Sequence, residues 1–291
     1  MLRRWSEQAA RVARRAVELA PMPQPRWAPL RHPVVLMHGF GAMANLMQGG
    51  VLHAEAMHLR GLGVAAYAPH VNPYDTLDVR ASAWADRLER VFRETGAGQV
   101  HLVAFSSGGL DARVLAAELG WADRIASLAT VSTPHRGTAL AEFVVSRPER
   151  LRAVAIGVMD FVGRAAYEPA PPRALDAIAE LTPRSVAARF GDGTLPGVWC
   201  GSYDSAAGQG TDVAMYPPLV VPNRILYRLD GLNDGIVPTA SMPWGEPLGT
   251  LHADHARQIG LGPGAAARFD SCAFFEGHCD RLRDREQVDG R

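Results

Sequence analysis

A serine at position 106 stands where a strand-like segment turns into a helix-like one, in the run VHLVAFSSGGLDARVL. Ala104 and Gly108 lie two places on either side of Ser106. Small residues are needed at these places because a turn that presents a nucleophile is strained and tightly packed. Such a turn holds the hydroxyl at a helix N-terminus, where backbone N–H groups stabilise developing negative charge. The pattern predicts Ser106 as a catalytic nucleophile.

Two alternatives compete with this interpretation of Ser106. Ser107 is the rival nucleophile, but that choice would put the bulky Phe105 at the cramped preceding position. A serine at the start of a helix can also act only as its N-cap. The apolar strand before Ser106 and the helix after it favour the catalytic role.

A nucleophilic serine needs a histidine base and a carboxylate that orients the base. With this type of turn, the three residues follow the chain order serine, acid, histidine. Three histidines lie late enough in the sequence, at positions 252, 255 and 278. His255 is the predicted base because it follows a predicted strand on a loop, where it can reach the serine. His252 is the runner-up, since it would lie inside the strand, and His278 is expected to be exposed in a polar tail.

The acid is expected in the run DGLNDGIVP, residues 230–238, which holds two aspartates. Asp234 is the predicted acid because Gly235 lets the loop turn and the following β-branched residues and proline anchor it. Asp230 is expected to end the preceding helix instead. A solvated turn residue remains the alternative role for either aspartate.

The segment VLMHGFG, residues 35–41, ends the first predicted strand with two glycines. In hydrolases with this kind of turn, a loop after that strand and the residue after the nucleophile supply two backbone N–H donors to the substrate oxygen. The predicted oxyanion hole therefore consists of the Phe40 and Ser107 amides. Losing one such donor typically costs about 100- to 1000-fold in rate. His38 precedes the serine in the chain, so we expect it to be structural.

Short apolar runs alternate with helix-like segments along much of the chain. The predicted strands are Val34–Met37, Val64–Ala68, Val100–Phe105, Ile125–Val131, Gly197–Tyr203 and Leu248–His252. The predicted helices between the first four strands are 45–60, 80–95 and 107–119. This alternation indicates a parallel sheet with right-handed crossovers. Residues 137–190 interrupt it with a long helical, proline-broken insertion.

The expected organisation is one large domain with an N-terminal extension. Residues 1–30 are predicted to form a helix and a proline-rich linker, and residues 31–291 the main domain. The 291 residues carry no formal net charge, which argues against a partner bound through phosphate neutralisation, such as a nucleic acid. The sequence has no apolar run long enough for a transmembrane helix and no secretory signal pattern, so a cytoplasmic location is expected.

The cysteines give no sign of a metal or redox motif. Cys200, Cys272 and Cys279 form no CxxC pair. A bridge between Cys272 and Cys279 would require an oxidising compartment, and reduced thiols are the default expectation.

The assembled motifs resemble those of the bacterial triacylglycerol lipases related to the Pseudomonas and Burkholderia enzymes. The matching pieces are VVLMHGFG, LVAFSSGGLDAR, ATVSTPHRGT, LNDGIVP and ADHARQIG, in the family's order, over roughly residues 33–265. The resemblance implies an α/β-hydrolase fold, with helices on both faces of a mostly parallel sheet. It also implies that the insertion at about 137–190 is a helical lid, and that the substrate is an ester or lipid met at a lipid interface.

Three features depart from the family. Ala104-Phe105 stands where the family usually has Gly-His, which alters the surroundings of the nucleophile. The family members are secreted, whereas no signal peptide is seen here. The family's calcium site uses an upstream aspartate, which Asp212 matches, and an aspartate two places after the histidine, where Arg257 stands. Arginine cannot ligate calcium, so we predict no metal or other cofactor and a pairing of Arg257 with Asp212.

The sequence thus predicts a lipase-like ester hydrolase that acts on medium or long acyl chains through an acyl-enzyme. A short-chain esterase or an acyltransferase on the same scaffold is the alternative. A non-catalytic binding protein is less consistent with the sequence, because none of the expected triad or oxyanion residues is missing. No protein partner is predicted.

Overall fold

The computed structural model describes residues 29–41, 50–149, 173–262 and 269–289. Its centre is one six-stranded sheet in the order β2-β1-β3-β4-β5-β6, with every neighbouring pair parallel. The strands are β1 (Val34–Met37), β2 (Ala66–Tyr67), β3 (Val100–Phe105), β4 (Ile125–Val131), β5 (Trp199–Ser205) and β6 (Glu246–Leu251). The predicted parallel sheet is confirmed.

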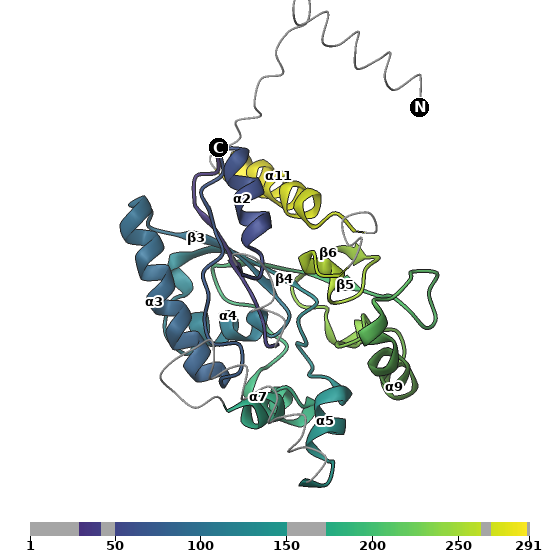
Figure 1. Ribbon diagram of the computed structural model, residues 1–291. Helices are drawn as coiled ribbons and strands as arrows, with labels where there is room; N and C mark the ends of the chain where they lie inside the picture. The colour runs from purple at the N-terminus through teal and green to yellow at the C-terminus, as the bar shows by residue number, and fades with distance from the viewer. Residues whose placement is uncertain (1–28, 42–49, 150–172, 263–268, 290–291) are drawn as a thin grey trace, which may run out of the picture.

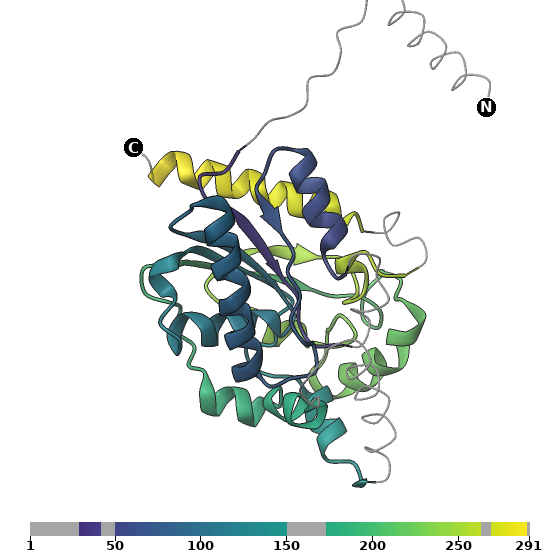
Figure 2. The same ribbon diagram turned by 60° about the vertical axis from the view of Figure 1, so that its left-hand side comes forward.

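Side chains of the central strands alternate between two apolar layers, because successive residues of a strand point to opposite faces. On one face, Val35 and Met37 pack in the cluster that holds Trp84 and Leu88 of α3 (Leu77–Thr95) and much of α4 (Gly108–Ala117). Val34 and Leu36 point to the other face, in the cluster that includes α2 (His53–Gly61) and α11 (Ser271–Asp289). Figure 2 shows α2 and α11 side by side on their face of the sheet.

The helices of the predicted insertion lie beyond the carboxyl ends of the strands. They are α5 (Ala139–Val145), α7 (Ala174–Glu180) and α8 (Pro183–Arg189), and α5 also contacts α9 (Val220–Asp230). Figure 1 shows α5 and α7 together at one end of the molecule, away from α11. The middle of the insertion, residues 150–172, lies outside the described residues, as do the predicted N-terminal helix and the first part of the predicted 45–60 helix.

The last helix, α11, corrects two expectations about the C-terminal region. Residues 271–289 form a helix and not a polar tail, and His278 is 1% exposed, so its predicted exposure is wrong. The side chains of Phe275, His278 and Leu282 are buried at helical spacing. Cys272 and Cys279 lie on this same helix as free thiols.

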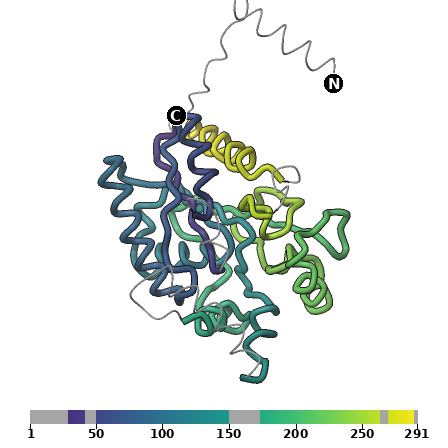
Figure 3. Tube along the Cα trace, in the orientation of Figure 1, coloured from purple at the N-terminus to yellow at the C-terminus, as the bar shows by residue number. Residues whose placement is uncertain are grey.

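The end of α11 meets the start of the described domain. Glu286 accepts hydrogen bonds from the backbone N–H groups of Arg31 and His32 at 2.8–3.2 Å. Figure 3 shows the two chain segments lying together. In the part of the chain that the structure describes, no helix combines the length and apolar character needed to cross a bilayer.

Candidate active site

The predicted nucleophile lies directly after β3 in a strained backbone conformation. Ser106 has a φ of 56°, in the left-handed region that residues other than glycine rarely adopt. Its backbone is held by neighbours: its N–H donates to Val131 O at 2.8 Å, and Thr133 Oγ1 donates to its carbonyl at 2.7 Å. Strain that is held in place in this way is a known feature of functional sites.

Two glycines let the loop after β1 pack against this turn. A Cβ at Gly39 would lie 2.7 Å from the Cβ of Ser106, and a Cβ at Gly108 would lie 2.9 Å from His38 O. Any larger side chain at either position would force the loop and the turn apart. In the sheet order, β1 and β3 are neighbours from which the chain leads off in opposite directions, where α/β proteins form their binding crevice.

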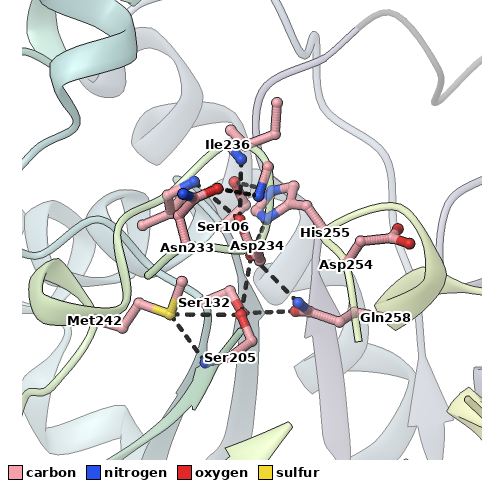
Figure 4. Close-up of polar contacts among 12 residues, drawn as sticks. Ser106, Ser132, Ser205, Asn233, Asp234, Ile236, Met242, Asp254, His255 and Gln258 are labelled. Carbon is pink, nitrogen blue, oxygen red and sulfur yellow. Dashed lines mark hydrogen bonds and ion pairs between the residues drawn. The ribbon is translucent and has the colours of Figure 1, made fainter. Parts of the chain in front are cut away.

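The three predicted catalytic side chains meet at the carboxyl edge of the sheet (Figure 4). His255 Nε2 lies 2.9 Å from Ser106 Oγ, and His255 Nδ1 lies 2.7 Å from Asp234 Oδ2. Because an ionised carboxylate only accepts, Nδ1 carries the proton and Nε2 is free to accept the serine proton. The backbone N–H of His255 also donates to Asp234 O at 2.9 Å, which joins the two loops.

Asp234 is fully buried yet electrostatically stabilised. Burial opposes ionisation, but the electrostatic attraction of the His255 ring, its hydrogen bond and the N–H groups of Val237 and Ile236 outweigh burial and lower the pKa of the Asp234 carboxyl. The carboxylate is therefore ionised at neutral pH, as a group that orients an imidazole must be. Asp230, the rejected candidate, ends α9 as expected.

The other histidines lie elsewhere. His252 is exposed and comes one residue after β6, not inside the strand. His278 contacts Tyr203 Oη at 3.0 Å on the α11 side of the sheet.

The predicted oxyanion donors, Phe40 and Ser107, lie close together beside Ser106, and one of them already has a hydrogen-bond partner. The amide N–H of Phe40 donates to Ser107 Oγ at 2.8 Å. A substrate oxygen that binds this N–H must share it with the hydroxyl or displace the hydroxyl.

A buried ion pair supports the loop that carries Phe40. Arg80 of α3 donates to Asp111 of α4 at 2.7 Å and to His38 O at 2.8 Å, and both charged side chains are at most 1% exposed. His38 Nδ1 lies 2.9 Å from Gly39 O, and its Nε2 accepts from Val71 N. Burial lowers the pKa of His38 to about 3, so its ring is neutral. The contacts agree with the expected structural role of His38.

An apolar cavity of about 360 Å³ lies beside His255. The insertion contributes part of its wall, through Leu140, Ala141 and Val144 of α5, Ile178 of α7, and Leu181. Phe105 also lines it and packs against the His255 ring, with 4.6 Å between the centroids. The phenylalanine that departs from the family pattern thus contacts both the predicted base and the cavity.

The residues around Arg257 do not fit a calcium ion. Arg257 is 5% exposed, pairs with Asp254 Oδ2 at 3.0 Å and donates to Ala214 O. The predicted Arg257–Asp212 pairing is wrong, because Arg257 pairs with Asp254 and Asp212 is exposed. Arg257 stands two places after His255, where a calcium ion would need an oxygen ligand that a guanidinium cannot supply. Among the described residues, no cluster of three or more histidine, cysteine or acidic side chains could hold a metal.

Sequence reasoning missed the contribution of Asp254, which precedes His255. Its Oδ1 accepts from the N–H groups of Ala256 and Arg257, and its Oδ2 accepts from Tyr216 N at 2.8 Å. An aspartate that caps the turn after it is a recognisable local pattern. Its bond to Tyr216, which is distant in sequence, leaves no such sign.

Comparison with known proteins places this architecture among lipases and esterases. The chain is 24% identical over 279 residues to a triacylglycerol lipase of Vibrio cholerae, covering 87% of this chain and 88% of the relative. A triacylglycerol lipase of Burkholderia plantarii is 31% identical over 124 residues, which is 40% of this chain and 34% of that protein. No family model matches the chain.

Solved structures agree on the fold. A lipase of Bacillus licheniformis superposes with a TM-score of 0.61 at 20% identity, covering 90% of this chain and 96% of that one. A metagenomic carboxyl esterase gives a TM-score of 0.68 at 17% identity, covering 91% and 79%. The predicted α/β-hydrolase fold and the resemblance to bacterial triacylglycerol lipases are confirmed.

Proposed function

We propose that this α/β-hydrolase-fold protein, similar to bacterial triacylglycerol lipases, cleaves esters of medium or long acyl chains through Ser106, His255 and Asp234. The coarser statement, that it is a lipase-like carboxylic ester hydrolase, follows from its likeness to these lipases and esterases. The observation that carries the finer proposal is the apolar cavity beside His255, walled in part by α5 and α7.

The chemistry follows from the geometry. His255 Nε2, 2.9 Å from Ser106 Oγ, takes the serine proton while Oγ attacks the ester carbonyl carbon. The Phe40 and Ser107 N–H groups stabilise the resulting oxyanion. As the intermediate collapses, the imidazolium returns its proton to the departing alcohol and leaves an acyl-enzyme. Water, deprotonated by His255, then attacks the acyl carbon and releases the carboxylic acid and free Ser106.

Acyl-chain preference tests the proposal. Burying one methylene is worth about 0.8 kcal/mol, so kcat/KM should rise up to about fourfold with each methylene until the cavity is filled. The measurement is kcat/KM for p-nitrophenyl esters from acetate to palmitate, below and above the concentration at which each ester forms aggregates. We expect a maximum at medium or long chains and a rise in rate at the lipid interface.

A pair of variants on α5 locates the acyl site. Val144→Trp fills the cavity and should shift the preferred chain to shorter esters, whereas Glu142→Trp, at an exposed position of the same helix, should leave it unchanged. A preference for acetate without interfacial response would indicate a short-chain esterase. Transfer of the acyl group to added alcohol in preference to water would indicate an acyltransferase.

A further inference from the structure

A buried chain of polar side chains extends beneath Asp234, on the side away from Ser106 (Figure 4). Asp234 Oδ2 receives three hydrogen bonds: from His255 Nδ1 at 2.7 Å, Ser205 Oγ at 3.0 Å and Gln258 Nε2 at 3.2 Å. Gln258 is 1% exposed and Ser205 is fully buried. The catalytic carboxylate is thus shared between the imidazole and two side chains that take no part in the mechanism above.

The orientation of the Gln258 amide is fixed by its other contacts. Ser132 Oγ donates to Oε1 at 2.6 Å, while Nε2 also donates to Ala253 O at 3.2 Å. A flipped amide would place its oxygen against two acceptors, Ala253 O and the Asp234 carboxylate. The N–H of Gln258 therefore points at Asp234, and the amide joins the loops of Asp234 and His255 to the end of β4.

Ser132 is the third side chain of this buried polar network, after Gln258 and Ser205. It is fully buried and has a φ of 50°, so it is strained like Ser106 and likewise follows a central strand directly. Its N–H donates to Tyr203 O at 3.0 Å, and its hydroxyl oxygen lies 2.7 Å from that of Ser205. The unusual conformation directs the hydroxyl hydrogen of Ser132 at Gln258 and places its oxygen beside Ser205.

We propose that Gln258 is a positioning residue for Asp234, held in its orientation by Ser132 and assisted by Ser205. The proposal rests on the proposed ester hydrolysis. Oδ1 of Asp234 is held by the N–H groups of Ile236 and Val237, and Gln258 and Ser205 hold Oδ2. With both oxygens fixed, the carboxylate cannot rotate away from His255 Nδ1, and it stays ionised when the imidazolium forms.

The first test replaces the amide. Gln258→Leu removes a hydrogen bond to a charged group, so kcat should fall about 10- to 100-fold while KM stays within about twofold. Ser205→Ala should act in the same direction. Ser202→Ala is the matched control, because it removes another buried hydroxyl of β5 that bonds Trp244 N and not Asp234, and its kcat should stay within about twofold. Thermal melting confirms that each variant is folded.

A double-mutant cycle then separates positioning from a merely structural role. In an Asp234→Asn background, Gln258→Leu should lower the residual kcat by less than about threefold, because the group on which it acts is already gone. If Gln258→Leu lowers kcat in the Asp234→Asn background by the same factor as in the wild type, the proposal is overturned.

The pH profile of Gln258→Glu gives a second readout. A protonated carboxyl can still donate to Asp234, whereas its ionised form repels Asp234. Burial and the neighbouring carboxylate both raise the pKa of the introduced group. The ratio of variant to wild-type kcat should therefore fall as pH rises, whereas a structural role predicts a constant ratio. If the wild type hydrolyses esters but Gln258→Leu keeps full kcat, only this proposal fails. If the wild type hydrolyses no ester, the proposed function fails.

Discussion

Ser106 and Ser107 are adjacent in the chain, but their hydroxyls have different partners. Ser106 Oγ faces His255, and Ser107 Oγ accepts the Phe40 N–H. We expect Ser106→Ala to lower kcat on the order of 10⁶-fold, as for loss of a nucleophile. Ser107→Ala keeps its backbone N–H and loses one neutral hydrogen bond, so its loss should be about 10-fold or less.

One chromogenic ester measures both serine variants, and melting temperature serves as the folding control. Equal losses in the two variants would contradict the assignment of the nucleophile. A rate increase in Ser107→Ala would instead mean that its hydroxyl competes with substrate for the Phe40 N–H.

At the scale of residues, the sequence predicts what depends on local pattern. Ser106, Asp234 and His255 are marked by small neighbours, turns and chain order, and the structure brings them within hydrogen-bond distance, although their roles remain predictions. The contacts of Gln258 with Ser132, 126 positions away, follow only from the register of the folded loops. The pairing of Arg257 is different, because its observed partner Asp254 is only three residues away, whereas the predicted partner was the distant Asp212.

At the scale of elements, the loop carrying His255 is fixed by an ion pair. Arg257 links Asp254 to Ala214 O, and Asp254 in turn binds Tyr216 N. Removing one partner of a buried pair costs about 3–5 kcal/mol. Arg257→Ala should therefore lower the free energy of unfolding by up to this amount and reduce kcat, because the loop loosens.

EDTA should leave the activity and melting temperature of the wild type unchanged, because Arg257 joins Asp254 to Ala214 O and offers no oxygen ligand to a calcium ion. Inactivation by EDTA with recovery on adding calcium would contradict this expectation. Asp212→Ala is the matched control for Arg257→Ala. Because Asp212 is exposed, its replacement should change neither the activity nor the melting temperature.

Helices α3 and α4 are joined to the loop that carries Phe40 by Arg80 and Asp111. Asp111→Leu leaves the Arg80 guanidinium buried without its carboxylate, so we expect a loss of about 3–5 kcal/mol in the free energy of unfolding. The loop that carries Phe40 should also become less rigidly held, since the Arg80 guanidinium that donates to His38 O loses its carboxylate partner. Urea unfolding followed by circular dichroism measures the first effect. An unchanged midpoint would show that the pair contributes nothing to stability.

The predicted bounds of an element match the observed ones when its apolar pattern is clearly delimited in the sequence. The predicted bounds of β3 and β4 coincide with the observed ones, because each is a short apolar run closed by turn residues. β2 is reduced to Ala66–Tyr67. α11 was missed because buried polar side chains, His278 and Ser271, interrupt the apolar period of its inner face.

At the scale of the whole molecule, parallel strands bring distant segments to one edge. The strand order places the loop after β1 beside the turn after β3, and the loops after β5 and β6 supply Asp234 and His255. Chain order and fold class therefore predict the location of the site. The same packing buries histidines on both sides of the sheet, which no sequence pattern indicates: His38 beside the site and His278 on the inner face of α11.

These buried histidines predict how stability depends on pH. Burial lowers the pKa of both His38 and His278 from 6.5 to about 3. The rings are thus neutral in the folded protein, whereas the unfolded chain binds a proton at each below pH 6.5. Since the unfolded state then holds more protons, stability present above pH 6.5 is lost as pH falls toward 3. Each histidine contributes a slope of up to about 1.4 kcal/mol per pH unit in that window.

Removing one of these histidines should reduce the pH dependence. His278→Asn cannot titrate and keeps an acceptor for Tyr203 Oη, so the free energy of unfolding should fall less steeply between pH 6 and pH 4, by up to about 1.4 kcal/mol per unit. His252→Asn, at an exposed histidine, is the control and should leave the slope unchanged. Urea unfolding at several pH values measures both slopes. If His278→Asn has the wild-type slope, His278 takes up its proton equally in the folded and unfolded states, and its burial on the inner face of α11 does not govern acid stability.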